Sequence, residues 1–226
     1  MLAKRNDLSS LPVVTYPVIG LAALATVTNI LSLFLAIGLL VKTGIVVVGA
    51  LLLLLNFRWI REVSKAWKMQ FNSLHLSAKL LFAFAVVFVL YLTAQPTLSY
   101  DEGLYYIQFI KWAETYPVVP GLANLHHRFG FNSSWHMLTA LFNTSSFTGV
   151  EENRINGVIY LLMLFHFLSG LREQNTFLRW LKGGMLVAIS LPFLIVYNLT
   201  SPNADIIILF LFLFGVDVWI TALIKG

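Results

Sequence analysis

Long apolar runs separated by shorter polar segments dominate the chain. A helix that crosses a bilayer needs about 20 apolar residues, within a range of roughly 17–25. By this criterion we expect six transmembrane helices, at residues 13–40, 44–57, 78–95, 155–171, 183–199 and 205–224. The pattern predicts an all-α, polytopic integral membrane protein with three regions. These are N-terminal membrane helices with a basic inner loop (1–95), an outer loop with short amphipathic helices (96–152) and C-terminal membrane helices (153–226).

Local signals refine these predicted helices. The first run is long enough either to tilt strongly or to break near Thr28 and Asn29, and the segment 42–44 predicts a tight turn before the second helix. Pro192 is expected to kink the fifth helix. Ser201 is expected to cap the last helix, because a proline follows it at the first helical position.

Composition supports a membrane protein. Of 226 residues, 58% are hydrophobic and 11% charged, against roughly 25% charged in soluble domains. The mean hydropathy is +0.81. The absence of cysteine excludes disulfides, thiolate nucleophiles and Cys-ligated metals. The first apolar run is too long for a signal peptide. We attribute the net charge of +5 to loop orientation and lipid headgroups, and expect the lipid bilayer, not nucleic acid, as partner.

The distribution of Lys and Arg predicts which side each loop faces. With both termini cytoplasmic, the inner segments hold eleven of the 15 basic residues. The outer segments hold the other four, which are Lys42, Lys111, Arg128 and Arg154. We therefore expect a multi-pass protein of a bacterial inner (plasma) membrane, with 96–152 outside. The basic segment 58–79, with Trp59 and Trp67, predicts either a plain orientation signal or an interfacial helix on the inner face.

The outer segment is predicted to contain two helices. Residues 103–115 have helical periodicity, and we expect their aromatic side chains to anchor this helix in the outer headgroup layer. Tyr105 and Trp112 are such anchors or stack on a sugar, and Lys111 lies on the polar face. The residues Asn132-Ser133-Ser134 are expected to cap a second helix that ends near Phe142.

An acidic pair, Asp101 and Glu102, opens the outer segment, and it has two interpretations. Ser99-x-x-Glu102 is a capping box, which explains both acids as a helix start. Alternatively, one carboxylate is a general base for an acceptor hydroxyl. The same segment holds His126, His127, Arg128 and His136, which suit a phosphate leaving group. Arg128 otherwise pairs with Glu114 or with lipid headgroups.

Further polar residues are candidates for binding. Asn203 and Asp205 are expected to bind sugar hydroxyls across from the acidic pair, unless they only start the last helix. The two adjacent histidines are expected to form hydrogen bonds; the alternative is a divalent cation held with His136 and a carboxylate. We expect no other cofactor. Within the bilayer, Asp217 and His166 form a functional site or a hydrogen bond between two helices.

Four stretches of the outer segment resemble an uncharacterised family of bacterial polytopic membrane proteins. They are YDEGLYY (100–106), IKW (110–112), PVVPGLANLH (117–126) and RFGFNSS (128–134). That family is similar to the GT-C glycosyltransferases, which use polyprenyl-phosphate sugars. The resemblance implies that Asp101 or Glu102 is the catalytic base, and Asn132 joins the candidate binding residues. GT-C enzymes usually have more helices, and their acidic motif follows the first one. Either the chain is therefore a fragment or it belongs outside this superfamily.

These observations predict a membrane glycosyltransferase. It would transfer a sugar from a polyprenyl-phosphate donor to a glycan or lipid acceptor of the cell envelope. Asp101 or Glu102 would take the acceptor proton, and Arg128, helped by His126, would stabilise the departing phosphate. The alternative is a non-enzymatic membrane subunit or transporter component that binds a glycan or a partner protein.

Overall fold

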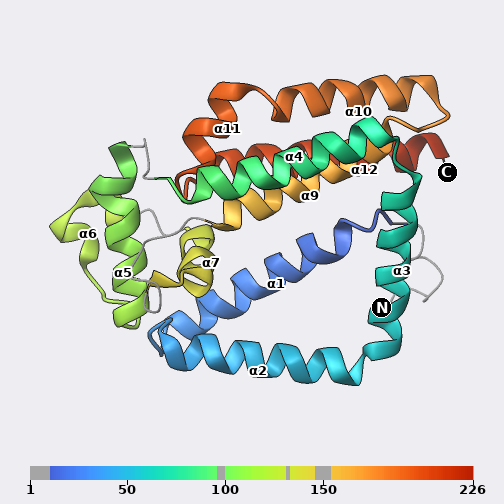
Figure 1. Cartoon of the computed structure of the whole chain (residues 1–226). Coiled ribbons are helices and arrows are strands. Elements are labelled where there is room, and N and C mark those ends of the chain that lie inside the picture. Colours follow the sequence, from blue (N-terminus) through green and yellow to red (C-terminus); the bar gives the residue numbers. More distant parts are fainter. Residues whose placement is uncertain (1–10, 96–99, 131–132, 146–153, 226) are drawn as a thin grey trace.

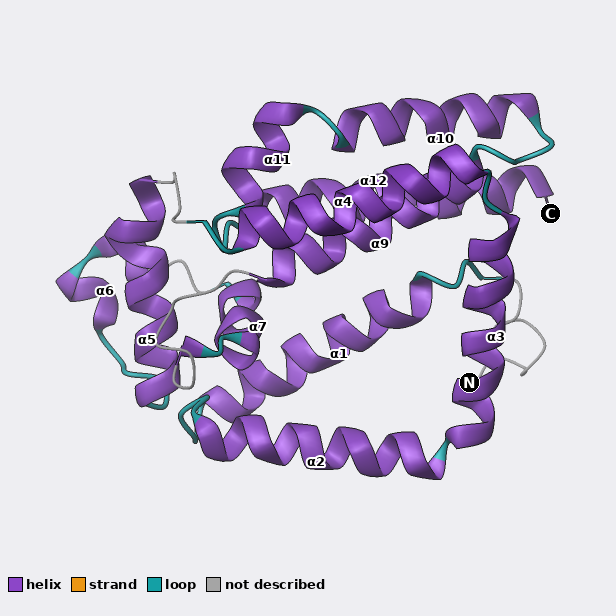
Figure 2. Cartoon of the chain, in the orientation of Figure 1, coloured by secondary structure: helices purple, strands orange, loops and turns teal. Residues whose placement is uncertain are grey.

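Helices make up the fold throughout the residues that the structure describes (Figures 1 and 2). The computed structural model describes residues 11–95, 100–130, 133–145 and 154–225. Its longer helices are α1 (Thr15–Ser32), α2 (Leu39–Leu55), α3 (Phe57–Ser73), α4 (Leu76–Thr93), α9 (Arg154–Gly170), α10 (Thr176–Ile189) and α12 (Asp205–Lys225). Its shorter ones are η2 (Glu102–Tyr106), α5 (Ile107–Thr115), α6 (Leu122–Leu125), η3 (His127–Gly130), α7 (Ser134–Phe142) and α11 (Pro192–Leu199). The predicted all-α class is confirmed.

Three helices, α1, α4 and α12, are long and apolar enough to cross a membrane. Helices α2 and α3 meet at a bend of 88° and add a fourth span if they are counted as one broken helix. The apolar α9 is shorter. By length and composition the described helices thus supply three or four spans, fewer than the predicted six. The difference arises because hydropathy counts apolar residues even where a helix breaks.

The first predicted span, 13–40, ends earlier than expected, and the second, 44–57, begins earlier. Helix α1 ends at Ser32 and α2 begins at Leu39. Between them the backbone leaves the helical path, and the Ile37 N–H donates a hydrogen bond of 2.7 Å to the carbonyl of Ala113 in α5. The turn expected at 42–44 is therefore wrong, because these residues lie inside α2.

Proline interrupts the fifth predicted span as expected. Helix α10 ends at Ile189 and α11 begins at Pro192. The start of the predicted span is wrong, because α10 begins at Thr176, where the Asn175 side chain accepts a hydrogen bond from the Leu178 N–H at 3.1 Å. Seven residues assigned to the inner loop are consequently helical.

The predicted bounds of the last span, 205–224, match α12 closely, but its predicted cap is wrong. Helix α12 begins at Asp205, and Ser201 is buried in the preceding loop. The side-chain oxygen of Asn203 accepts a hydrogen bond from the Asp205 N–H at 2.8 Å. Asparagine therefore fills the capping role that the sequence analysis gave to serine.

Helix α9 lies at the centre of a bundle with α4, α10 and α12 (Figure 1). The bundle core includes the fully buried Phe165, Phe167 and Phe210. A second cluster forms where α1 and α2 meet α5 and α7, around Ile37 and Leu138. The short helices gather at one end of the molecule, and α3 crosses the other end (Figure 1).

The predicted inner-face segment forms a helix, α3, that is basic on its exposed side. Arg58, Arg61, Lys65 and Lys68 are all exposed. Its tryptophans pack on protein: Trp67 stacks on Phe165 with ring centroids 4.8 Å apart, and Trp59 meets Tyr16 edge-on at 5.5 Å. Helix α3 is therefore fixed to the bundle and to α1 by aromatic contacts.

Candidate functional site

The two acidic residues lie at the start of one continuous helical stretch, but their side chains have different surroundings. A π turn, Glu102–Tyr106, leads directly into α5. Glu102 is buried with Tyr105 and Tyr106, whereas the Asp101 side chain is 40% exposed. Single π turns within helices occur frequently at functional sites. Of the two candidate bases, Asp101 is thus the one that solvent reaches. Ser99 lies outside the described residues, so the capping box stays a prediction.

Asp101 forms an ion pair with Arg128, which is 27 residues away in sequence. The Nη1 atom of Arg128 donates to Oδ1 of Asp101, and the guanidinium lies 5.1 Å from the centre of the Tyr105 ring. The Arg128 side chain is 32% exposed. The alternative pairing with Glu114 is therefore wrong. The structure brings the candidate base and the candidate phosphate ligand into direct contact.

Arg128 reaches Asp101 from a short 3₁₀ turn that begins at His127. The backbone N–H of Arg128 donates to Nδ1 of His126 at 3.3 Å. The rings of His126 and His127 stack with centroids 4.9 Å apart and an interplanar angle of 19°, so both rings lie on one side of the turn. Among the described residues no group of three or more His, Asp or Glu side chains is placed to hold a metal.

A buried layer of Tyr106 and His136 lies beneath the ion pair. The two rings are 4.7 Å apart, and both side chains are buried. Burial lowers the pKa of His136 to about 4, so this histidine is neutral at physiological pH. Burial, a hydrogen bond with Tyr105 and the charges of Asp205 and Asp101 raise the pKa of Tyr106. We call seven residues the outer polar cluster, after the segment 96–152, predicted to lie outside, that holds six of them. They are Asp101, Glu102, Tyr105, Tyr106, Arg128, His136 and Asp205.

Comparison with known proteins assigns the chain to a family. A family model described as "Domain of unknown function (DUF8201)" matches residues 3–226. The chain belongs to this DUF8201 family. No curated protein and no solved structure matches it.

The other residues of this DUF8201 chain that were predicted to bind substrate are not members of the outer polar cluster. Lys111 is exposed on α5, and Trp112 packs against Tyr116 at 5.6 Å and lines a pocket. The Asn203 amide donates to the side-chain oxygen of Asn198 in α11 at 2.8 Å. Asn132 lies outside the described residues. The predicted residues that the structure brings together thus belong to three places. These are the helical stretch that begins at Asp101, the 3₁₀ turn η3 that carries Arg128, and the start of α12.

Aromatic side chains of η2 and α5 point toward the protein interior. Tyr105 and Phe109 are buried, together with Ile110. Helix α5 packs on α7, which Ser133 caps as predicted, its hydroxyl accepting from the Trp135 N–H at 3.3 Å. The expectation that Tyr105 anchors the helix in lipid headgroups is therefore wrong.

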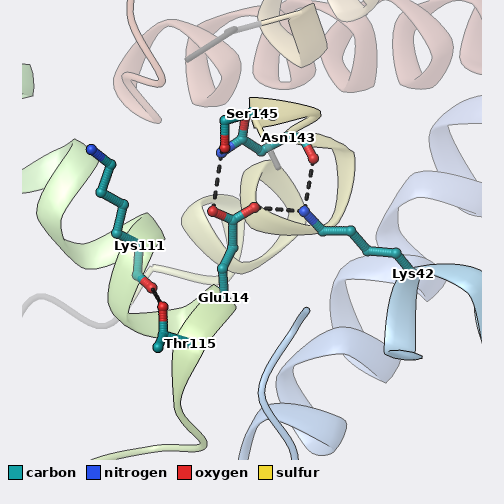
Figure 3. A network of polar contacts seen from close by, with 6 residues as sticks. All are labelled: Lys42, Lys111, Glu114, Thr115, Asn143 and Ser145. Atoms are coloured by element: carbon teal, nitrogen blue, oxygen red, sulfur yellow. Dashed lines mark hydrogen bonds and ion pairs between the residues drawn. The ribbon is translucent and has the colours of Figure 1, made fainter. Parts of the chain in front are cut away.

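A second polar network, which sequence reasoning missed, holds this region to α2 (Figure 3). The ammonium group of Lys42 donates to Oε1 of Glu114 at 2.5 Å and to the carbonyl of Asn143 at 2.7 Å. The Asn143 amide donates to Oε2 of Glu114 at 3.2 Å and to Ser145 at 3.0 Å. The signal was a lysine within an apolar run, which requires a polar partner.

Asn156, which sequence reasoning also missed, secures the loop before α12. This residue is fully buried in α9. Its amide donates to the backbone carbonyls of Asn198, Ser201 and Asn203 at 2.8–3.1 Å, and its side-chain oxygen accepts from the Trp135 indole at 2.8 Å. The Asn156 side chain therefore sets the position, relative to α7, of the loop that leads into α12.

Two hollows border α1. A pocket of about 250 Å³ is lined by Trp112, Phe129 and residues of α5 and α6, and it includes Ser32 of α1. A groove of about 630 Å³ runs between α1 and α2 and includes Leu31. Gly20, Gly44 and Gly49 line this groove, and their lack of side chains widens it.

Proposed function

We propose that the protein is a membrane glycosyltransferase whose outer polar cluster transfers a sugar from a polyprenyl-phosphate donor to a glycan or lipid of the cell envelope. The contact between Asp101 and Arg128 carries the proposal. Sugar transfer needs a carboxylate at the acceptor hydroxyl and a cation at the leaving phosphate. Both groups lie here at one partly exposed place.

The proposed topology has six passes, with both termini in the cytoplasm of a bacterial cell. In Figure 1 the long helices run alternately between the α3 end and the α5 end. Helix α3 carries exposed basic residues, as expected of a cytoplasmic face. In this topology the broken α10–α11 unit and the shorter α2 and α9 count as passes, and the outer polar cluster faces the periplasm.

In the proposed reaction, Arg128 exchanges its partner. Donor phosphate competes with Asp101 for the guanidinium, which fits a phosphate in a bidentate manner. Asp101 then accepts the proton of the acceptor hydroxyl. The acceptor oxygen bonds to the anomeric carbon, the bond between that carbon and the phosphate oxygen breaks, and its electron pair leaves with the polyprenyl phosphate. His126 orients the arginine through its bond to the backbone N–H of Arg128.

The apolar groove between α1 and α2 supports a lipid-linked donor. Its lining is almost wholly apolar, which suits an isoprenoid chain. The groove and the Trp112 pocket meet neighbouring residues of α1, Leu31 and Ser32. A prenyl tail in the groove would therefore direct its phosphate toward the outer segment.

A non-enzymatic subunit or transporter component is the second candidate, and the same ion pair favours it. Asp101 and Arg128 neutralise one another without a ligand, which is what a structural contact requires. In this alternative the pair only holds the 3₁₀ turn η3 against the helical stretch that begins at Asp101. The two functions predict different responses to a substitution that keeps the charge.

Binding of a labelled polyprenyl phosphate to the purified protein tests the donor site. Arg128→Lys keeps the charge and loses bidentate geometry, so we expect roughly tenfold weaker binding. Arg179→Lys, at an exposed position on α10, is the matched control and should bind as the wild type does. Equal affinity of the Arg128→Lys variant and wild type would remove the donor-site assignment.

Asp101→Asn tests the base separately. Loss of a general base should reduce transfer by roughly 10²–10⁴-fold at nearly unchanged stability. An exposed ion pair contributes only about 0–1 kcal/mol, so a merely structural pair predicts little change in either quantity. Full transfer activity in a folded Asp101→Asn variant would favour the subunit.

A further inference from the structure

A second polar cavity lies at the opposite end of the bundle from the outer polar cluster. It has a volume of about 570 Å³. Side chains of α9, α10 and α12 line it, together with Gln70 of α3 and the first described residues of the chain. Both Leu11 and Lys225, near the two ends of the chain, contribute to its lining. The proposed sugar transfer makes no use of this cavity.

Three buried ionisable groups from three helices form one wall. Asp217 of α12 accepts hydrogen bonds through Oδ2 from Lys182 Nζ at 2.6 Å and from His166 Nε2 at 2.7 Å. The three side chains are 1–6% exposed. The predicted hydrogen bond between Asp217 and His166 is confirmed. Lys182, expected in an inner loop, is the additional member.

Three further polar atoms of this wall have no hydrogen-bond partner among the described residues. They are Oδ1 of Asp217, Nδ1 of His166 and Oγ1 of Thr221, and all three are buried. A buried polar atom without a partner destabilises the folded state, so such atoms are rare in native proteins. The three residues that carry these atoms all line the cavity, which indicates that a group bound there supplies the missing partners.

The chemistry of these atoms defines that group. A carboxylate only accepts, so the histidine proton lies on Nε2, facing Asp217, and Nδ1 is an acceptor. The wall thus offers two acceptors and one hydroxyl. Lys182 neutralises Asp217, and Glu173 pairs with Lys225 at 2.8 Å on the rim, so the paired charges favour neither an anion nor a second cation. Hydroxyl groups of a neutral ligand satisfy all three atoms.

We propose that this cavity is a binding site for a neutral, hydroxyl-rich group, either a soluble sugar or polyol or the headgroup of a glycolipid. Its volume falls within the range of small-molecule sites, roughly 300–1,000 Å³. The bound hydroxyls donate to Asp217 Oδ1 and His166 Nδ1, and one of them accepts from Thr221.

Thr221→Val is the decisive variant, because it is isosteric, removes the hydroxyl and leaves the ion pair intact. Thr26→Val is the matched control, since Thr26 bonds only to the carbonyl of Ala22 in its own helix. The full chain in detergent is titrated with maltose, glycerol and ethylammonium. It is then placed in vesicles with either glucosyl-diacylglycerol or phosphatidylcholine, whose headgroup has no hydroxyl. Binding is followed by saturation-transfer NMR for the soluble probes and by co-purification for the lipids.

We expect maltose, glycerol or the glucolipid to bind wild type and Thr26→Val, and to bind Thr221→Val roughly two- to tenfold more weakly. A response to soluble probes alone identifies a free polyol, and a response to the glucolipid alone identifies a headgroup. Melting temperatures near that of the wild type show that the variants are folded. His166→Gln, which lacks the Nδ1 acceptor, is a second variant with the same expected loss. Absence of binding by every hydroxylated probe, selective binding of ethylammonium, or undiminished binding by both site variants would overturn the proposal.

Discussion

Lys42 and Glu114 form an ion pair of 2.5 Å that joins α2 to α5. They are 72 residues apart, and their side chains are only 10% and 15% exposed. Because Glu114 lies in α5, eight residues after Tyr106, the pair fixes the helix that carries the acidic residues. The position of the outer polar cluster therefore depends on a contact outside it.

Lys42→Ala should destabilise the protein substantially. Removal of one partner leaves a largely buried charge without compensation, which costs about 3 kcal/mol. Lys65→Ala is the control, because its pair with Glu62 is more than half exposed and should change stability by less than about 1 kcal/mol. Chemical unfolding of both purified variants in detergent measures the difference, and equal effects would contradict the structural role of Lys42.

Acidification should destabilise the protein through His136. Its pKa is lowered from 6.5 to about 4, so between these values the unfolded chain binds a proton that the native protein does not. The free energy of unfolding is unaffected above pH 6.5 and falls as the pH decreases toward 4. At about pH 5 the loss is roughly 2 kcal/mol. His136→Gln should abolish this component, whereas His75→Gln, at an exposed position, should retain it.

Gly170→Ala should disturb the buried ion pair between Lys182 and Asp217. A Cβ atom at Gly170 would collide with the side-chain carbons of Lys182, so the lysine has to shift away from Asp217. We expect a loss of about 1–3 kcal/mol. At Gly184 the same substitution meets nothing within 4 Å, and stability should stay the same or rise by about 0.5–1 kcal/mol. Thermal unfolding of the two alanine variants distinguishes these outcomes.

Cysteine labelling of intact cells tests the topology. The chain has no cysteine, so a single introduced thiol reports only its own position. Gln108 on α5 and Ser64 on α3 are both exposed. A membrane-impermeant reagent should label Gln108→Cys and leave Ser64→Cys unmodified until the cells are opened. The reverse pattern would place the outer polar cluster in the cytoplasm.

The sequence suggested several members of the candidate site but could not show their contacts. Asp101, Arg128 and Asp205 were recognisable because charged residues are rare in this chain. Arg128 pairs with Asp101 and not with Glu114. This choice depends on how the 3₁₀ turn η3 folds back over the helical stretch that begins at Asp101. Asn156 gave no local signal, since its role is to bond carbonyls more than 40 residues away.

Local rules determined much of the secondary structure. Apolar runs gave the helical class, Pro192 gave the break before α11 and Ser133 gave the cap of α7, because each effect involves neighbouring residues only. Tertiary contacts decided the rest. The gap between α1 and α2 exists because the backbone there bonds to α5, and Lys42 and Lys182 are buried because Glu114 and Asp217 neutralise them. Hydropathy alone assigns a lysine to water; only a partner brought close by folding makes its burial stable.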